Sequence, residues 1–492
     1  MRNIRCREQG GSKIFYRGRK CFIKAALFLG LAGTALGLNA CQSIADAVSS
    51  VTDVYYPGCS SYVADNEHYA ASSSQVSKCS VEPGSAEDVG IILAILDETK
   101  TPFGVKGGGH SENQGFSSTT GVQIAMTRFN EVTYDPTTQT AVVGAGNIWD
   151  DVYEVLNAQG VNVLGGRIPG VGVAGLTLGG GYSYLSNQHG LVLDNVVAYE
   201  LVMPNATVVA VTEENDPDLF FSLKGGFNNY GIVTRFTLKA YPQGPVWGGA
   251  ASYNASYISA FNAAAVKFSS EVTDPRAAML MTYTYASGQV LLAILMFYDG
   301  PTPPDGIFDD FLAIPALAQD VTTRSYFDLF NSSFATTNAG AGHRAVYNHI
   351  PTLEYSESFI EGIVDELNFW GSTLSAHGAV SITYAIEPFL PSLLTHAPAG
   401  SSAYPSSRDH VVFPTAVSLE WASQSEDDVF HDAARQTVKK LGVAGETIYP
   451  NYAIYDVPVV DMYGEEGVKR MEATRERVDP HGVMLLTGGF KV

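Results

Sequence analysis

The chain has 492 residues, of which 46% are hydrophobic and 16% are charged. This length predicts two or three domains, and the apolar content allows them a large packed interior. The formal net charge is −21. It argues against nucleic acid and anionic membrane surfaces as partners, because both repel an acidic protein.

The first forty residues differ in composition from the rest of the chain. Arginine and lysine recur up to Lys24, an apolar run covers residues 25–38, and Asn39-Ala40 follows. This order is typical of a signal peptide, and the apolar run is shorter than the ~20 residues that a membrane span needs. We therefore expect residues 1–40 to be a signal peptide and the mature protein to be secreted, without stable membrane insertion. An alternative, relevant only to a bacterium, is lipoprotein-type cleavage at residues 38–41.

Five cysteines bear on the same expectation. Cys6 and Cys21 lie in the segment expected to be removed, and in an oxidising compartment Cys59 and Cys79 could form a disulfide. Cys41 would then be the odd cysteine. No cysteine–histidine cluster has zinc spacing, so we expect no metal. Sequons for N-glycans, which fit an exported chain, lie at Asn205, Asn254 and Asn331.

Short strands and helices alternate in the first half of the chain. Ser85 is placed to cap a helix with Asp88 in its first turn, followed by apolar residues at helical spacing. Strands are expected at 101–106, 122–126, 141–145, 196–202, 208–211 and 231–238, and helices at 148–158 and 218–223.

The pattern changes near Pro242. Longer alternating strands, such as 280–285 and 380–386, are separated by helices expected at 309–318 and 355–370. This pattern predicts an antiparallel sheet with helices on one face, and therefore a second domain in an α+β protein. A different segment begins at Thr447 and contains Tyr449-Pro-Asn-Tyr452.

Two glycine-rich loops are the clearest functional signal, at residues 106–111 and 165–181. Glycine leaves backbone N–H groups open to a ligand, and a series of them suits a pyrophosphate. Two such loops, more than fifty residues apart, could close on one dinucleotide from both sides. The alternative is that each loop is only a tight turn. Neither loop has the full GxGxxG fingerprint of a doubly wound sheet.

The motifs resemble those of the vanillyl-alcohol oxidase superfamily, whose FAD-binding domain is called PCMH-type, and within it the secreted fungal members of the berberine-bridge-enzyme-like group. The resemblance runs over residues 81–241 and 449–479, and rests on several separate motifs. They are Val105-Lys-Gly-Gly-Gly-His-Ser111, Val171-Gly-Val-Ala-Gly175, Gly179-Gly-Gly-Tyr182, Gly190-Leu-Val-Leu-Asp-Asn-Val196, Asp218-Leu-Phe-Phe-Ser-Leu-Lys-Gly-Gly226, Tyr230-Gly-Ile-Val-Thr234, Tyr449-Pro-Asn-Tyr452, Tyr463-Gly464 and Asp479-Pro480.

The resemblance implies how the chain is divided. After a lead-in segment at 41–80, an FAD-binding domain would span 81–243, a substrate domain 244–446, and a C-terminal segment, 447–492, would complete the FAD domain. The resemblance implies that FAD is held by Lys106, Gly107, Gly108, Gly109, His110, Ser111, Val171, Gly172, Gly175, Gly179, Gly180, Gly181, Tyr182, Asp194, Gly231, Ile232 and Val233.

The resemblance also implies a covalent flavin. Relatives bond the 8α-methyl group of FAD through the histidine that stands here at His110. Many have a second bond from a cysteine, but this chain has Ile168 at that position, so we expect a single tether. Val171 matches a position where valine is associated with reaction of the flavin with O2. The alternatives are that His110 only hydrogen-bonds its loop and that Val171 only packs.

The expected reaction is removal of a hydride from an alcohol, sugar or secondary metabolite to flavin N5, with O2 giving H2O2. Relatives use the residue at Tyr452 as base, with Tyr449 and Asn451 shaping the site. Alternatives are oxidative cyclisation or desaturation in a biosynthetic enzyme, or a non-catalytic secreted flavin-binding protein, against which Tyr452 argues. Substrate contacts are expected from the second domain, at Tyr283, Tyr285, Tyr384, Arg408, Glu420 and Trp421, although the sequence leaves open which face of the sheet meets the flavin.

Overall fold

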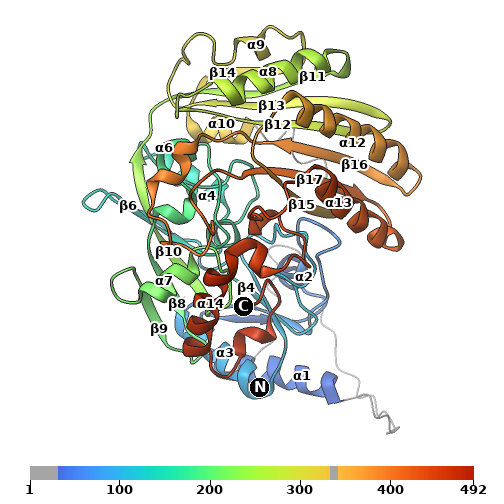
Figure 1. Ribbon diagram of the computed structural model, residues 1–492. Coiled ribbons are helices and arrows are strands. Elements are labelled where there is room, and N and C mark those ends of the chain that lie inside the picture. The colour runs from blue at the N-terminus through green and yellow to red at the C-terminus, as the bar shows by residue number, and fades with distance from the viewer. Residues whose placement is uncertain (1–31, 333–341) are drawn as a thin grey trace, which may run out of the picture.

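A computed structural model describes residues 32–332 and 342–492 and contains three β-sheets (Figure 1). Most of the expected signal peptide, with Cys6 and Cys21, lies outside the described residues. The described chain begins with helix α1 (Ala32–Ala47). Within these residues, no helix combines the length and apolar character that a bilayer crossing requires.

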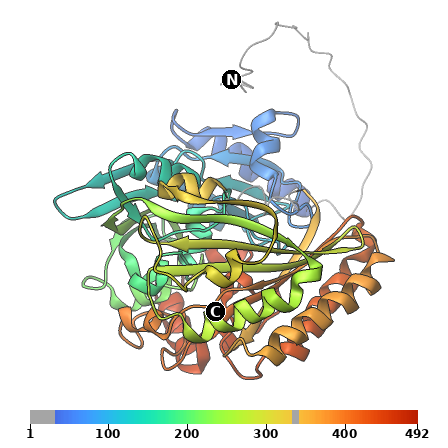
Figure 2. The ribbon, with the colours of Figure 1, turned by 90° about the horizontal axis from the view of Figure 1, so that it is seen from above.

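The largest sheet, which we call the roof sheet, has seven antiparallel strands in the order β14-β11-β13-β12-β16-β17-β15. Helices α8, α12 and α13 pack on one face of it, and the blue N-terminal elements lie on the other side (Figure 2). The strands are β11 (Val246–Asn254), β12 (Ala277–Ala286), β13 (Gln289–Tyr298), β14 (Ala316–Arg324), β15 (Arg344–Thr352), β16 (Ala379–Ile386) and β17 (Phe413–Trp421). The helices are α8 (Ile258–Glu271), α12 (Glu357–Ser375) and α13 (Asp427–Leu441).

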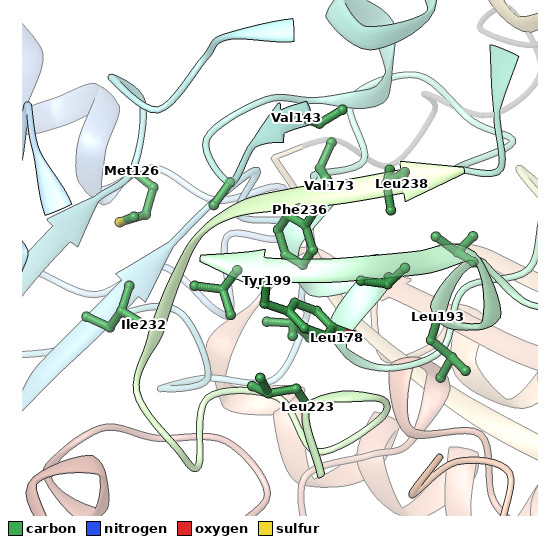
Figure 3. Close-up of a cluster of buried hydrophobic side chains, with 14 of the residues drawn as sticks. Met126, Val143, Val173, Leu178, Leu193, Tyr199, Leu223, Ile232, Phe236 and Leu238 are labelled. Carbon is green, nitrogen blue, oxygen red and sulfur yellow. The ribbon is translucent and has the colours of Figure 1, made fainter. Parts of the chain in front are cut away.

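The other two sheets share one hydrophobic core, and with the C-terminal segment we call them the two-sheet half. One sheet has the order β1-β2-β4-β3, and the other has β5-β6-β10-β8-β9 with β7 paired to β10. Figure 3 shows Tyr199 and Phe236 packed in this core. The strands are β1 (Asp53–Tyr55), β2 (Cys79–Glu82), β3 (Phe103–Lys106), β4 (Val122–Ala125), β5 (Val132–Asp135), β6 (Thr140–Gly144), β7 (Val161–Val163), β8 (Val196–Val202), β9 (Val208–Val211) and β10 (Ile232–Pro242).

The helices of this half begin close to where the sequence predicts them. Ser85 accepts a hydrogen bond from the Asp88 backbone N–H, so it caps the helix as expected. The short helix that precedes Gly179 lies within the second glycine-rich segment, 165–181. The helices are α2 (Ser60–Asn66), α3 (Ala86–Thr99), α4 (Trp149–Asn157), α5 (Val173–Leu178), α6 (Ser186–His189) and α7 (Pro217–Leu223).

The C-terminal segment packs against the two-sheet half. Helix α14 (Val459–Val478) lies against α7, and the Tyr463 hydroxyl donates to the carbonyl of Gly225. Thr487 forms a β-bridge with Phe103 at the edge of the first sheet. Residues from opposite ends of the chain therefore complete one body.

Strand alternation decides which face of the roof sheet is available to a ligand. Tyr283, Tyr384 and Trp421 are buried in the core under the helices. The expectation that these tyrosines and this tryptophan contact substrate is therefore wrong. Tyr285 lies on the same face, against Gly371 of α12. Residues one position away, including Glu420, point towards the two-sheet half because successive side chains alternate.

One expected helix is shorter than predicted. The sequence predicts a helix over 309–318, but α9 (Asp309–Leu312) ends early and β14 begins at Ala316. Pro315 lies between them. Proline has no backbone N–H and its ring clashes with the preceding turn, so the helix cannot continue.

The disulfide differs from the expected pair. Cys79 is bonded to Cys41, not to Cys59, with a Cα–Cα distance of 6.1 Å. The reason is tertiary: α1 packs on α3 next to β2, and this places Cys41 beside Cys79 in the buried core. The sequence could not show where α1 lies.

Replacing Cys41 by alanine should lower the free energy of unfolding by about 2–4 kcal/mol, because the bond closes a loop with a sequence separation of 38 residues and constrains the unfolded chain. Denaturant unfolding of the oxidised protein measures the change. A Cys41→Ala/Cys79→Ala double variant should show the same loss, which excludes an effect of the free thiol. Unchanged stability in both would contradict the prediction.

Candidate active site

The two glycine loops touch through their backbones. A Cβ on Gly108 would lie 2.6 Å from the backbone N and Cα of Gly172, and one on Gly172 would lie 2.5 Å from the Gly108 N. Only glycine at both positions permits this approach. The structure therefore brings together the two segments that the sequence singled out.

The residues around this contact fit a dinucleotide. A Cβ added at Gly170 or Gly175 would meet no atom within 4 Å, so the backbone there borders open space. The Thr177 hydroxyl is buried and has no hydrogen-bond partner within the described chain. Backbone N–H groups without neighbouring side chains can donate hydrogen bonds to a bound pyrophosphate, and the unsatisfied hydroxyl can bond to the ligand as well.

Tyr449 and Asn451 hold the second glycine loop in place. The Tyr449 hydroxyl accepts a hydrogen bond from the Gly181 N–H at 3.1 Å, and the Asn451 amide donates to that hydroxyl at 2.9 Å. Asn451 also donates to the carbonyl of Leu176. Both side chains therefore connect the C-terminal segment to the loop, and this geometry favours positioning over proton transfer. Tyr182 packs edge-on against the Tyr449 ring.

Two of the expected cofactor residues make other contacts. The Lys106 ammonium donates to the carbonyls of Ala64 and Glu67 at the end of α2. Asp194 forms a buried ion pair with Arg408 at 2.6 Å. Arg408 thus lies outside the strands of the roof sheet and is paired with a residue of the two-sheet half.

The other expected cofactor residues lie along the loops or at the start of β10. Gly231 has a φ of +142°, and a Cβ there would lie 2.3 Å from the Val202 carbonyl oxygen. The Val171 carbonyl accepts from the Trp149 N–H. The remaining members are Gly107, Gly109 and Ser111 on the first loop, Gly179 and Gly180 on the second, and Ile232 and Val233 on β10.

His110 is half-buried at the end of the first glycine loop. Burial lowers the pKa of its imidazole to about 4, so the ring is neutral at physiological pH. A neutral imidazole has a free nitrogen lone pair, which a nucleophile requires. The Tyr69 ring stacks on it with a centroid distance of 4.2 Å.

Tyr452 lies in a network of three polar side chains. Its hydroxyl donates to Glu387 Oε1 at 3.0 Å and accepts from an Arg167 N–H at 3.2 Å. Arg167 also forms an ion pair with Glu387 at 2.5 Å, and both charged side chains are buried. Burial raises the pKa of Glu387, while Arg167 opposes the rise. Burial also raises the pKa of Tyr452, so its hydroxyl keeps its proton at rest.

Two further carboxyl groups lie beside this network. Burial raises the pKa of Glu112 to about 7, and the charge of Glu420 adds to the rise. Glu420 is on the ligand side of β17 and accepts a hydrogen bond from the Ser381 hydroxyl. The ring of Tyr347, from β15, lies 4.7 Å from that of Tyr452.

Sequence reasoning did not single out Arg167, Glu387, Glu112, Tyr69 or Tyr347. Two signals were present. Arg167 is the one charged residue inside the glycine-rich segment 165–181, and Glu387 directly follows the strand predicted at 380–386. Their proximity depends on how the roof sheet meets the second loop, which no local pattern encodes.

Comparisons with known proteins agree with this geometry. Residues 77–212 match the family described as FAD binding domain. The chain is 30% identical over 480 residues to the FAD-dependent monooxygenase drtC of Aspergillus calidoustus, which covers 92% of this chain and 88% of that protein. Among solved structures it resembles BBE-like 1 of Physcomitrella patens, with a TM-score of 0.76, 21% identity and coverage of 90% and 97%.

It also resembles glucooligosaccharide oxidase of Acremonium strictum, with a TM-score of 0.73, 18% identity and coverage of 91% and 97%. These matches confirm the predicted α+β fold with a PCMH-type FAD-binding domain. The chain is therefore an enzyme that belongs to the FAD-dependent oxidoreductases, and it has the fold of the berberine-bridge-enzyme-like oxidases.

Proposed function

We propose that the protein is an FAD-dependent oxidase that removes a hydride from the C–H of an alcohol, sugar or secondary metabolite and returns electrons to O2. The observation that carries the proposal is the Tyr452 hydroxyl, held between Glu387 and Arg167. This network lies between the second glycine loop, the roof sheet and the C-terminal segment. It offers a proton acceptor where a substrate would lie between the roof and the flavin.

The two glycine loops would hold the diphosphate, and His110 would tether the ring system. Bound FAD supplies the hydride acceptor. A single tether is supported by Ile168, which packs against Ala250, Leu280 and Leu295 under the roof sheet. The solved oxidase of Acremonium strictum, in contrast, is described with both a 6-S-cysteinyl and an 8α-N1-histidyl bond to FAD.

The network gives the substrate proton a defined path. A substrate hydroxyl beside Tyr452 would donate to the phenol oxygen while the phenol proton passes to Glu387 Oε1, 3.0 Å away. The raised pKa of Glu387 makes its carboxylate a better acceptor. Arg167 donates to Glu387 Oε2 and to the phenol oxygen, which holds both side chains in position, and its charge balances that of the carboxylate before transfer. No free tyrosinate is needed.

A biosynthetic oxidation is the second candidate. Two relatives whose alignments cover 92% of this chain, drtC and tpcD, are named FAD-dependent monooxygenases. Such an enzyme would close a ring, desaturate or oxygenate its substrate. A peroxide-coupled screen of sugars and aromatic alcohols, followed by mass analysis of the product, separates the two. Equimolar peroxide with a product in which the alcohol has become a carbonyl supports the oxidase, whereas a new ring, a new C=C bond or incorporated oxygen supports the alternative.

Export and reaction with O2 are part of the same proposal. The Cys41–Cys79 disulfide suits an oxidising compartment. The asparagines of all three sequons, Asn205, Asn254 and Asn331, are exposed and so accessible to a glycan. Val171 lies on the second loop, where a small side chain would leave room for O2.

Replacing Tyr452 by phenylalanine should lower kcat about 10²–10⁴-fold, because the proton path through the phenol oxygen is lost while the ring packing stays. Turnover by peroxide release and flavin content by absorbance measure the two effects. Glu387→Gln should also lower kcat, since an amide cannot accept the phenol proton. Full turnover in the Tyr452→Phe enzyme would remove this residue as the base.

Replacing His110 by alanine should abolish covalent flavin. Acid-precipitated wild-type protein should give a yellow pellet, since a tethered flavin survives denaturation, and the variant should give a colourless one. Flavin retained in the variant pellet would contradict the assignment of the tether to His110.

Replacing Glu112 by glutamine should stabilise the protein at alkaline pH. A carboxyl whose folded pKa is raised from 4.5 to about 7 costs stability as pH rises through this interval, and all of the cost is present above it. Because Glu112 is only half-buried, we expect a gain on the order of 1–2 kcal/mol near pH 8 and little gain near pH 4.5. Denaturant unfolding tests this, with the exposed Glu472→Gln as control. A gain independent of pH would speak against the prediction.

A further inference from the structure

The segment around Tyr69 is fixed on both sides. The Tyr69 N–H donates to the Gly109 carbonyl at 3.0 Å, and its own carbonyl accepts from the Gly342 N–H at 2.9 Å. The Ala71 N–H donates to the His343 carbonyl at 2.8 Å. Tyr69 therefore connects the first glycine loop to the chain that leads into β15.

The next residues strengthen the connection to the roof sheet. The buried Ser72 hydroxyl donates to the Ala345 carbonyl at 3.1 Å and accepts from the Ala345 N–H at 3.0 Å. Ala345 is on edge strand β15, opposite Glu420 of β17. The Tyr69 backbone thus has little freedom to move relative to either the loop or the roof.

The Tyr69 side chain covers one face of His110. The two rings are nearly parallel, with an interplanar angle of 14° and a centroid distance of 4.2 Å. Within the described chain no side chain hydrogen-bonds the His110 imidazole, so the stacked Tyr69 ring is an aromatic contact that can hold the plane of the imidazole. His110 follows Gly109, whose φ of +70° is in the left-handed region, and such a turn would not by itself fix the imidazole orientation.

We propose that Tyr69 is a positioning residue for covalent attachment of the flavin at His110. The inference rests on the proposed tether. In that step the imidazole N–H and one C–H of the 8α-methyl group are lost as an N–C bond forms. Two protons leave, two electrons reduce the flavin, and O2 takes them up to give peroxide. The stack holds the imidazole plane so that its lone pair points at the methyl carbon, and orientation of this kind governs the rate of bond formation.

The test uses full-length protein produced without flavin and then supplied with FAD. Covalent incorporation is followed over time by flavin fluorescence of the denatured chain on a gel, and non-covalent binding by quenching of free FAD fluorescence. Tyr69→Phe keeps the stacked ring and should attach flavin within about twofold of the wild-type rate. Tyr69→Ala and Tyr69→Leu lack the ring and should attach it at least about tenfold more slowly while still binding FAD, as orientation effects of this size are common.

The matched control is Tyr134→Ala, which removes a tyrosine from β5 and should leave the rate unchanged. If wild-type protein gains no covalent flavin, the proposed tether at His110 is wrong, and the positioning role of Tyr69 is wrong with it. If wild-type protein is tethered and Tyr69→Leu is tethered equally fast, the positioning role is overturned. A slow Tyr69→Phe variant would also overturn it, because the hydroxyl and not the stack would then be required.

Discussion

The buried ion pair between Arg167 and Glu387 is the interaction on which the site depends. Arg167 comes from the second glycine loop, Glu387 follows strand β16 of the roof sheet, and both contact Tyr452 of the C-terminal segment. Removing two charges from water is costly, and the pair compensates only because its geometry is good and further hydrogen bonds satisfy it. Breaking one partner would leave an unpaired charge in the interior. The pair therefore fixes how the three parts of the chain meet.

The glycine loops in the same region require backbone without side chains. Gly108 and Gly172 need bare backbone because each occupies the space where the other would place a Cβ. A loop without side chains has few packing contacts of its own. Tyr449 and Asn451 supply them from the C-terminal segment by hydrogen bonds to Gly181 and Leu176. The end of the chain is thus needed to shape a loop encoded nearly three hundred residues earlier.

Local structure was largely readable from the sequence. Ser85 marks the start of α3, and β8 and β9 have the bounds that alternation and the intervening turn predict. The glycine loops stood out through their density of glycine, and Tyr452 through the resemblance to relatives that use this position as base. The partners of Tyr452 could not be found this way, since Arg167 and Glu387 are 220 residues apart. Cys41 likewise meets Cys79 only because α1 packs on α3. This is a tertiary contact, which no local sequence pattern encodes.

The roof sheet shows why a shared fold can serve different substrates. Its large aromatic residues, including Tyr283, Tyr384 and Trp421, face the helices and stabilise the domain. The opposite side of the sheet carries polar side chains such as Glu420 and Tyr347, and Glu387 follows directly after β16. Residues on this side can change without disturbing the core, because alternation separates the two faces. Substrate choice is thereby uncoupled from folding, while the proposed proton path remains tied to Arg167, which belongs to the second glycine loop.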